Sequence, residues 1–164
     1  MQHLPLAAGM TDFIQKVLTQ AVAASLAHVE SGGILFVGVI VDGDQVISEF
    51  SVNRVHETGD PTAHAEIVAI RAALAASGRT DLRGTILLAT GEPCGMCYRY
   101  ALDAGITDIR VAVPRDEVAA LGFDYRDSYR AFGITDTIRD THMHPLRVPG
   151  DTEPFTRFHT LQNI

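Results

Sequence analysis

His64-Ala65-Glu66 and Pro93-Cys94-Gly95-Met96-Cys97 are the two stretches that indicate the fold of this chain. The second stretch holds the only two cysteines in the sequence. A histidine and two thiolates supply three zinc ligands and leave the fourth position open, which is the pattern of catalytic zinc sites. A structural site would need a fourth protein ligand, and the sequence offers no third cysteine. The two stretches therefore predict a catalytic zinc ion held by His64, Cys94 and Cys97.

Each stretch lies at the start of a predicted helix. Asp60 suits the N-cap of a helix over residues 62–77, with Pro61 in its first turn, and Pro93 opens a helix over residues 93–104. A helix N-terminus lowers the pKa of a thiol and favours the thiolate that binds metal.

The spacing within the stretches limits where the metal can lie. Cys94 and Cys97 are three residues apart and share one face of a helical turn. His64 and Glu66 are two apart, so they reach one site only when that site lies off the end of their helix. We therefore expect zinc between two helix N-termini, with Glu66 beside the ligands as a proton carrier.

The remaining pattern predicts alternating strands and helices. We expect further helices over residues 12–30, 116–121 and 155–162, strands over 34–41, 45–50, 85–90 and 109–113, and a polar loop over 52–59. Thr11 or Asp12 can cap the first helix, and the pattern weakens after Gly122. This alternation is typical of an α/β sheet covered on both faces.

Composition limits the class of protein. A chain of 164 residues that is 46% hydrophobic forms one domain, spanning residues 1–164. No stretch approaches the roughly 20 apolar residues needed to cross a bilayer, and the first residues do not resemble a signal peptide, so we expect a cytoplasmic protein. The net charge of −7 and the single lysine, Lys16, count against a nucleic-acid partner.

Several stretches together carry a resemblance to a known family. They are Asn53-Arg54-Val55, Gly59-Asp60-Pro61-Thr62-Ala63-His64-Ala65-Glu66-Ile67, Ala69-Ile70-Arg71, Glu92-Pro93-Cys94-Gly95-Met96-Cys97 and Ala120-Leu121-Gly122-Phe123-Asp124. Residues 33–129 resemble the cytidine deaminase-like superfamily, whose zinc-dependent base deaminases share the His-x-Glu and Pro-Cys-x-x-Cys signature. Within it they are most similar to the bacterial guanine deaminases.

The resemblance implies an architecture. We expect a three-layer α/β/α sandwich with a five-stranded mixed sheet, assembled as a homodimer with one zinc ion per subunit. Residues 122–164 would be a C-terminal lid or interface segment, exchanged between subunits and carrying the aromatic residues Phe155 and Phe158. The same aromatic residues could instead belong to a helix that packs on the core.

The resemblance also implies the residues that contact a base. Asn53 would hydrogen-bond it, Phe36 would line or stack on it, and Ala65 would offer backbone contacts. An acidic residue after Gly-Phe contacts the base in the guanine branch, and here either Asp124 or Asp127 matches it. Asn53 could otherwise stabilise a loop, Phe36 could be a core residue, and the two aspartates could be solvated turn residues.

The resemblance implies hydrolytic deamination of a free nucleobase, with Glu66 as the catalytic acid and base and guanine to xanthine plus ammonia as the first choice. Rival substrates are cytosine, isocytosine and an amino-triazine such as ammeline, and then a nucleoside or a tRNA adenosine. Rivals of another kind are a non-catalytic zinc-binding protein and a redox pair at the two cysteines. His142 and His144 could form a second metal pair.

Overall fold

The computed structural model describes residues 6–163. Its strands are β1 (Val37–Asp42), β2 (Gln45–Val46), β3 (Ser51–Val52), β4 (Ile86–Gly91), β5 (Asp108–Val113) and β6 (Met143–Pro145). Its helices are α1 (Ala8–Glu30), α2 (Val55–Thr58), α3 (Ala65–Ser77), α4 (Gly95–Asp103), α5 (Arg115–Ala120), α6 (Asp127–Ala131), α7 (Asp136–His142) and α8 (Glu153–Gln162).

The strands form one mixed sheet. Its main path is β2-β1-β4-β5-β6, and the short β3 pairs with β1 beside it. β1 runs antiparallel to β4, whereas β4, β5 and β6 are mutually parallel. The five-strand path confirms the expected mixed sheet, and the parallel half places the carboxyl ends of β4 and β5 at one edge.

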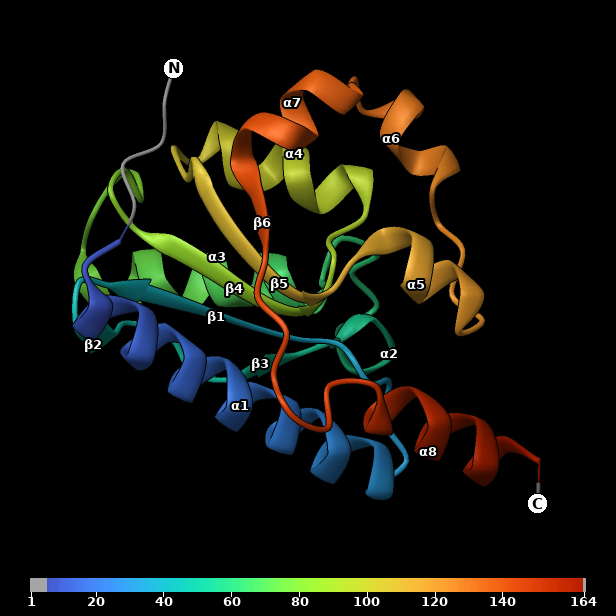
Figure 1. Cartoon of the computed structure of the whole chain (residues 1–164). Coiled ribbons are helices and arrows are strands. Elements are labelled where there is room, and N and C mark those ends of the chain that lie inside the picture. Colours follow the sequence, from blue (N-terminus) through green and yellow to red (C-terminus); the bar gives the residue numbers. More distant parts are fainter. Residues whose placement is uncertain (1–5, 164) are drawn as a thin grey trace.

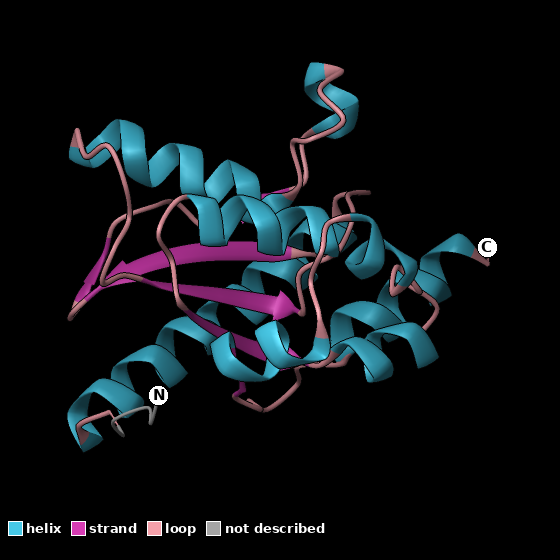
Figure 2. Cartoon of the chain, turned by 90° about the horizontal axis from the view of Figure 1, so that it is seen from above, coloured by secondary structure: helices cyan, strands magenta, loops and turns pink. Residues whose placement is uncertain are grey.

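Helices cover both faces of this sheet (Figure 1). Alternate residues of β1 point to opposite faces, as they must in a strand. Val37, Val39 and Val41 pack with α1 and with Phe155 of α8, whereas Ile40 packs with the buried face of α3. Figure 2 shows the strands between the two helical layers, which confirms the three-layer α/β/α sandwich.

The first helix and the first hairpin differ from the predicted boundaries. α1 begins at Ala8 with Ala7 as its N-cap, because the backbone N–H groups of Met10 and Thr11 already donate to the Ala7 carbonyl at 2.9 and 3.0 Å. The expected strand over 45–50 is interrupted after Val46. The Ser48 hydroxyl oxygen accepts the backbone N–H of Ile40 at 2.9 Å, and this bond stands in place of a backbone hydrogen bond between the two strands.

The helix that carries Glu66 also begins later than predicted. Its N-cap is His64, and Asp60 instead accepts the N–H and the hydroxyl of Thr62 at 2.9 and 2.6 Å, which closes a local turn. Arg71 pairs with the second Asp60 oxygen at 2.9 Å. The expected polar loop over 52–59 contains the short helix α2.

Residues 122–163 are more regular than their sequence pattern predicts. They form α6, α7, β6 and α8, and β6 extends the sheet by pairing with β5. None of the helices in residues 6–163 is long and apolar enough to cross a membrane.

Candidate active site

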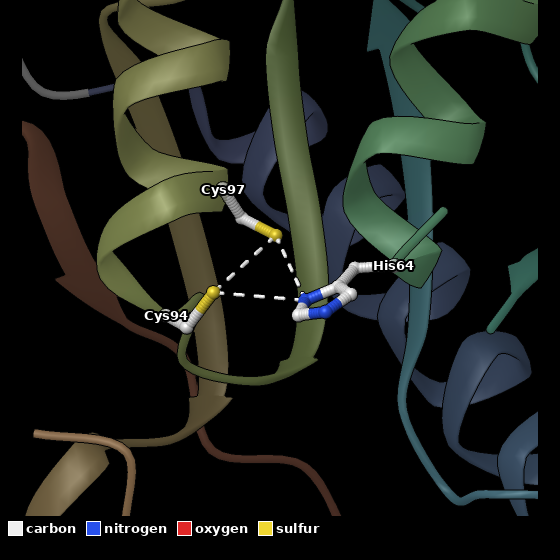
Figure 3. A group of neighbouring side chains, drawn as sticks. All are labelled: His64, Cys94 and Cys97. Atoms are coloured by element: carbon white, nitrogen blue, oxygen red, sulfur yellow. Dashed lines mark hydrogen bonds between the residues drawn. The ribbon is translucent and has the colours of Figure 1, made fainter. Parts of the chain in front are cut away.

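The predicted metal ligands meet at the N-termini of α3 and α4 (Figure 3). His64 is the N-cap of α3 and Cys94 is the N-cap of α4, each with an extended backbone. Cys97 lies in the first turn of α4, so its thiol faces the same point. Over residues 6–163, His64, Cys94 and Cys97 are the only group of three or more His, Cys, Asp or Glu residues that could hold a metal ion. His142 and His144 are therefore not part of such a group.

The distances between the ligand atoms fit zinc. His64 Nδ1 lies 3.6 Å from Cys94 Sγ and 3.5 Å from Cys97 Sγ, and the two sulfurs are 3.7 Å apart. A tetrahedral ion with ordinary Zn–S and Zn–N bonds places a nitrogen and a sulfur about 3.6 Å apart and two sulfurs about 3.8 Å apart. The side chains are thus arranged as a three-ligand zinc set with a fourth position open.

The two thiols differ in acidity. The hydrogen bond from Cys97 lowers the pKa of Cys94 to about 4, with a further contribution from His64. The same hydrogen bond, together with burial, raises the pKa of Cys97. The hydrogen bond with Cys94 raises the pKa of His64. The thiolate form, which the lowered pKa of Cys94 favours, is the form that binds a metal.

Glu66 lies beside the ligand set. Its side chain is buried, and Oε2 lies 3.4 Å from Cys97 Sγ. Burial raises the pKa of Glu66 to about 7, with a further contribution from the charge of Cys94. A carboxyl group that titrates near neutral pH can both accept and donate a proton, as general acid–base catalysis requires.

A glycine in the sheet lets Glu66 come this close. Gly38 of β1 lies under the first turn of α3, and a Cβ atom there would be 3.0 Å from the Cα of Glu66. A side chain at this position would make a tight contact with the start of α3, and glycine lets the helix start rest directly on the strand.

A cavity of about 250 Å³ opens beside these groups. Its lining residues are Ile34, Phe36, Asn53, His64, Ala65, Glu66, Glu92, Cys94, Phe123 and Tyr125. The structure therefore brings Phe36, Asn53 and Ala65 to one cavity with Glu66.

Two of these residues line the cavity and also make the local contacts that the sequence offered as alternatives to a base contact. Asn53 lines the cavity, and its Oδ1 also accepts the N–H of Val55 at 3.0 Å, so it stabilises the loop as well. Phe36 lines the cavity and also packs edge-on against Phe123 and Phe155 of the core.

The two candidate aspartates lie elsewhere in their own chain. Both are exposed and neither lines the cavity. Asp124 pairs with Arg126 at 2.8 Å, and this hydrogen bond lowers the pKa of Asp124 to about 2. Asp127 begins α6.

The cavity includes residues that the sequence did not single out as site residues. Tyr125, between the two aspartates, points inward, and its hydroxyl donates to the carbonyl of Glu92. Phe123 lies next to it in the same wall. Glu92 directly precedes Pro93 and Cys94, and that position in the motif was the only signal that could have marked it.

The site is a His-Cys-Cys ligand set beside a buried glutamate, and it lies at two helix N-termini of an α/β/α sandwich. Together these features define a zinc-dependent deaminase. Residues 11–113 match the family model of the cytidine and deoxycytidylate deaminase zinc-binding region. The chain belongs to this family.

Relatives from more than one branch of the family are similar to this chain. The guanine deaminase of Bacillus subtilis is 31% identical over 147 residues, which cover 89% of this chain and 94% of that protein. The tRNA-specific adenosine deaminase of Agrobacterium fabrum is 42% identical over 88 residues, which cover 53% of this chain and 54% of that protein. A solved structure of guanine deaminase from Nitrosomonas europaea has a TM-score of 0.72 at 18% identity, covering 100% of this chain and 97% of that one, and supports the fold.

Proposed function

We propose that this protein is a hydrolytic deaminase of a free nucleobase, with guanine to xanthine plus ammonia as its reaction. The observation that carries the proposal is the cavity that encloses Glu66 together with His64 and Cys94. A similar relative that spans nearly the whole chain is named a guanine deaminase, which supports the choice of base.

His64, Cys94 and Cys97 would hold one zinc ion per subunit. The chemistry that bound zinc supplies at such a site is the activation of water near neutral pH. The donor set fits this task because three protein ligands leave one position for water or substrate.

Glu66 moves the protons. A carboxylate oxygen of Glu66 takes a proton from the attacking water as the oxygen adds to the ring carbon that bears the amine. Glu66 passes this proton to the adjacent ring nitrogen. It then takes the remaining proton from the hydroxyl on the carbon and gives it to the departing amine, so that a carbonyl forms and ammonia leaves. Because Glu66 is not one of the three ligands, its oxygens stay available for these transfers.

The other cavity residues hold the base. Phe36 offers an apolar ring, Asn53 offers an amide for hydrogen bonds to the base edge, and Ala65 offers backbone contacts at the start of α3. Asp124 or Asp127 remains the proposed acidic contact to guanine, and an exchange of the C-terminal segment between the subunits of a homodimer would be needed to bring either one to a cavity.

Other substrates keep the same chemistry and change the base. Cytosine, isocytosine or ammeline would fit the cavity without an acidic contact. A tRNA adenosine is favoured by the 42% identity to a tRNA-specific deaminase over half the chain, but the net charge of −7 opposes it. A non-catalytic zinc protein would not need Glu66. We propose a cytoplasmic enzyme that acts on a small molecule, without nucleic-acid or membrane partners.

The experiment is ammonia release from the zinc-loaded protein. The panel is guanine, cytosine, isocytosine, ammeline, cytidine, guanosine and a tRNA anticodon stem-loop. We expect guanine to be turned over with the highest kcat/KM. Turnover of pyrimidines or triazines without guanine would support the deaminase chemistry and contradict guanine as the substrate. No turnover of any of these compounds would contradict the proposal that the protein is an enzyme.

A further inference from the structure

Glu92 is a fully enclosed carboxylate at the end of β4, directly before Pro93 and the ligand Cys94. Its side chain has no exposed area. Arg139 of α7 binds it with two hydrogen bonds, from Nε to Oε2 at 2.6 Å and from Nη2 to Oε1 at 2.8 Å. The Tyr98 hydroxyl donates to Oε2 at 2.7 Å. The backbone N–H of Arg115 donates to Oε1 at 2.9 Å. A buried charge needs this much pairing to be stable, and Arg139 supplies the opposite charge and two of the hydrogen bonds that fix the position of Glu92.

The backbone on both sides of Cys94 is held by α6. The Tyr129 hydroxyl donates to the carbonyl of Pro93 at 2.6 Å. The N–H of Gly95 donates to the Ser128 hydroxyl oxygen at 2.8 Å. These two bonds bracket Cys94, whose extended backbone as N-cap of α4 aims its sulfur at His64.

α6 is pressed against the start of α4 and is tied to the same carboxylate. A Cβ atom on Gly95 would lie 2.3 Å from the carbonyl oxygen of Ser128, so no other residue fits there without a backbone shift. The Tyr129 hydroxyl also lies 3.4 Å from Oε2 of Glu92. One hydrogen-bond network therefore connects α7 and α6 with Glu92 and Pro93, the two residues before the ligand Cys94.

We propose that Arg139 is a positioning residue for the metal centre, acting through Glu92 on the sulfur of Cys94. The sulfur has to lie within a few tenths of an ångström of its place in the His-Cys-Cys set, and partners that orient a metal ligand in this way affect metal affinity or activity by about 10–100-fold. Arg139 itself does not line the cavity, so a change confined to Arg139 leaves every cavity-lining residue in place.

Two variants test the proposal. Arg139→Lys keeps the positive charge but loses the two-point contact with Glu92. The double variant Glu92→Gln with Arg139→Met removes both charges together, which avoids leaving an unpaired buried carboxylate that could prevent folding. The control is Arg110→Gln, because Arg110 pairs with Asp108 at 2.7 Å and its side chain is 20% exposed, close to the 16% of Arg139.

The readouts are the rate at which a chelator extracts zinc, the thiolate absorption bands of the cobalt-loaded protein, and kcat and KM measured separately. In both test variants we expect zinc extraction to be at least about tenfold faster, the cobalt bands to shift, and kcat to fall. In Arg139→Lys, which leaves every cavity-lining residue in place, KM should be unchanged. The Arg110 control is expected to match the parent in all of these, even where its melting temperature is lower.

A folded variant with the extraction rate, cobalt spectrum and kcat of the parent would overturn the proposal. If the double variant does not fold, Arg139→Lys decides, since it retains the charge that the buried carboxylate needs. The inference rests on the proposed zinc site, and measurements on the parent protein distinguish failure of that site from failure of the role of Arg139. If the parent binds no zinc, the zinc site itself is rejected. If parent and variants hold zinc equally, only the role of Arg139 is rejected.

Discussion

Glu66 is the residue on which the proposed chemistry depends most directly. It lies in the first turn of α3, buried and next to the ligand set but outside it. Zinc binding does not need this carboxylate, whereas proton transfer does. Metal content and turnover should therefore respond differently when it is changed.

Glu66→Gln is expected to lower the rate of ammonia release by at least about 100-fold, because the amide cannot take or return a proton. Zinc content, measured by elemental analysis, should stay at the parent value. Glu153→Gln, an exposed change in α8, is the matched control and should leave the rate unchanged. Parent-like turnover in the Glu66 variant would reject the mechanism.

The N-termini of helices α3 and α4 meet at the ligand set, so a bound metal would link the two elements. Removal of zinc by a chelator is expected to abolish ammonia release and to lower the melting temperature, because binding to the folded state alone stabilises it. Adding zinc back should restore both. Full turnover by metal-free protein would contradict this prediction.

Helix α8 is an element of the core as well as a candidate lid. Phe155 has no exposed area and packs against Phe36 of the cavity wall. Loss of the tail should therefore lower the stability of the fold in addition to the activity.

Phe155→Ala is expected to lower the free energy of unfolding by about 3–5 kcal/mol, the usual effect of emptying a buried aromatic site. Urea denaturation measures this. The neighbouring exposed change Thr156→Ala should stay within about 0.5 kcal/mol of the parent. Equal stabilities of the two variants would show that α8 is not part of the core.

The elements differed in how well the sequence predicted them. β1, β4, β5 and the helices α3 and α4 carry apolar runs or clear helix starts, and they appear close to where the pattern placed them. α6, α7 and β6 are 5, 7 and 3 residues long and have no clear period. Tertiary contacts form them instead, through the pairing of β6 with β5 and of Arg139 with Glu92.

At the scale of the whole molecule, the homodimer is the prediction that bears on Asp124 and Asp127. Both are exposed and neither lines the cavity of its own chain, so we propose that an acidic contact to the base comes from a second subunit. Light scattering during size exclusion should give twice the mass of one chain. Asp124→Asn or Asp127→Asn should then raise KM for guanine by about tenfold, the effect of one lost charged hydrogen bond. A monomer that turns over guanine would reject this role.

The sequence by itself determined the three candidate metal ligands and the class of fold. The spacing of His64, Glu66, Cys94 and Cys97 is local, and local spacing already restricts which side chains share a helix end. The tertiary structure alone decided that Tyr125 and not an aspartate lines the cavity, and that Arg139 reaches Glu92. Those placements depend on contacts between segments far apart in the chain, and no local pattern encodes them.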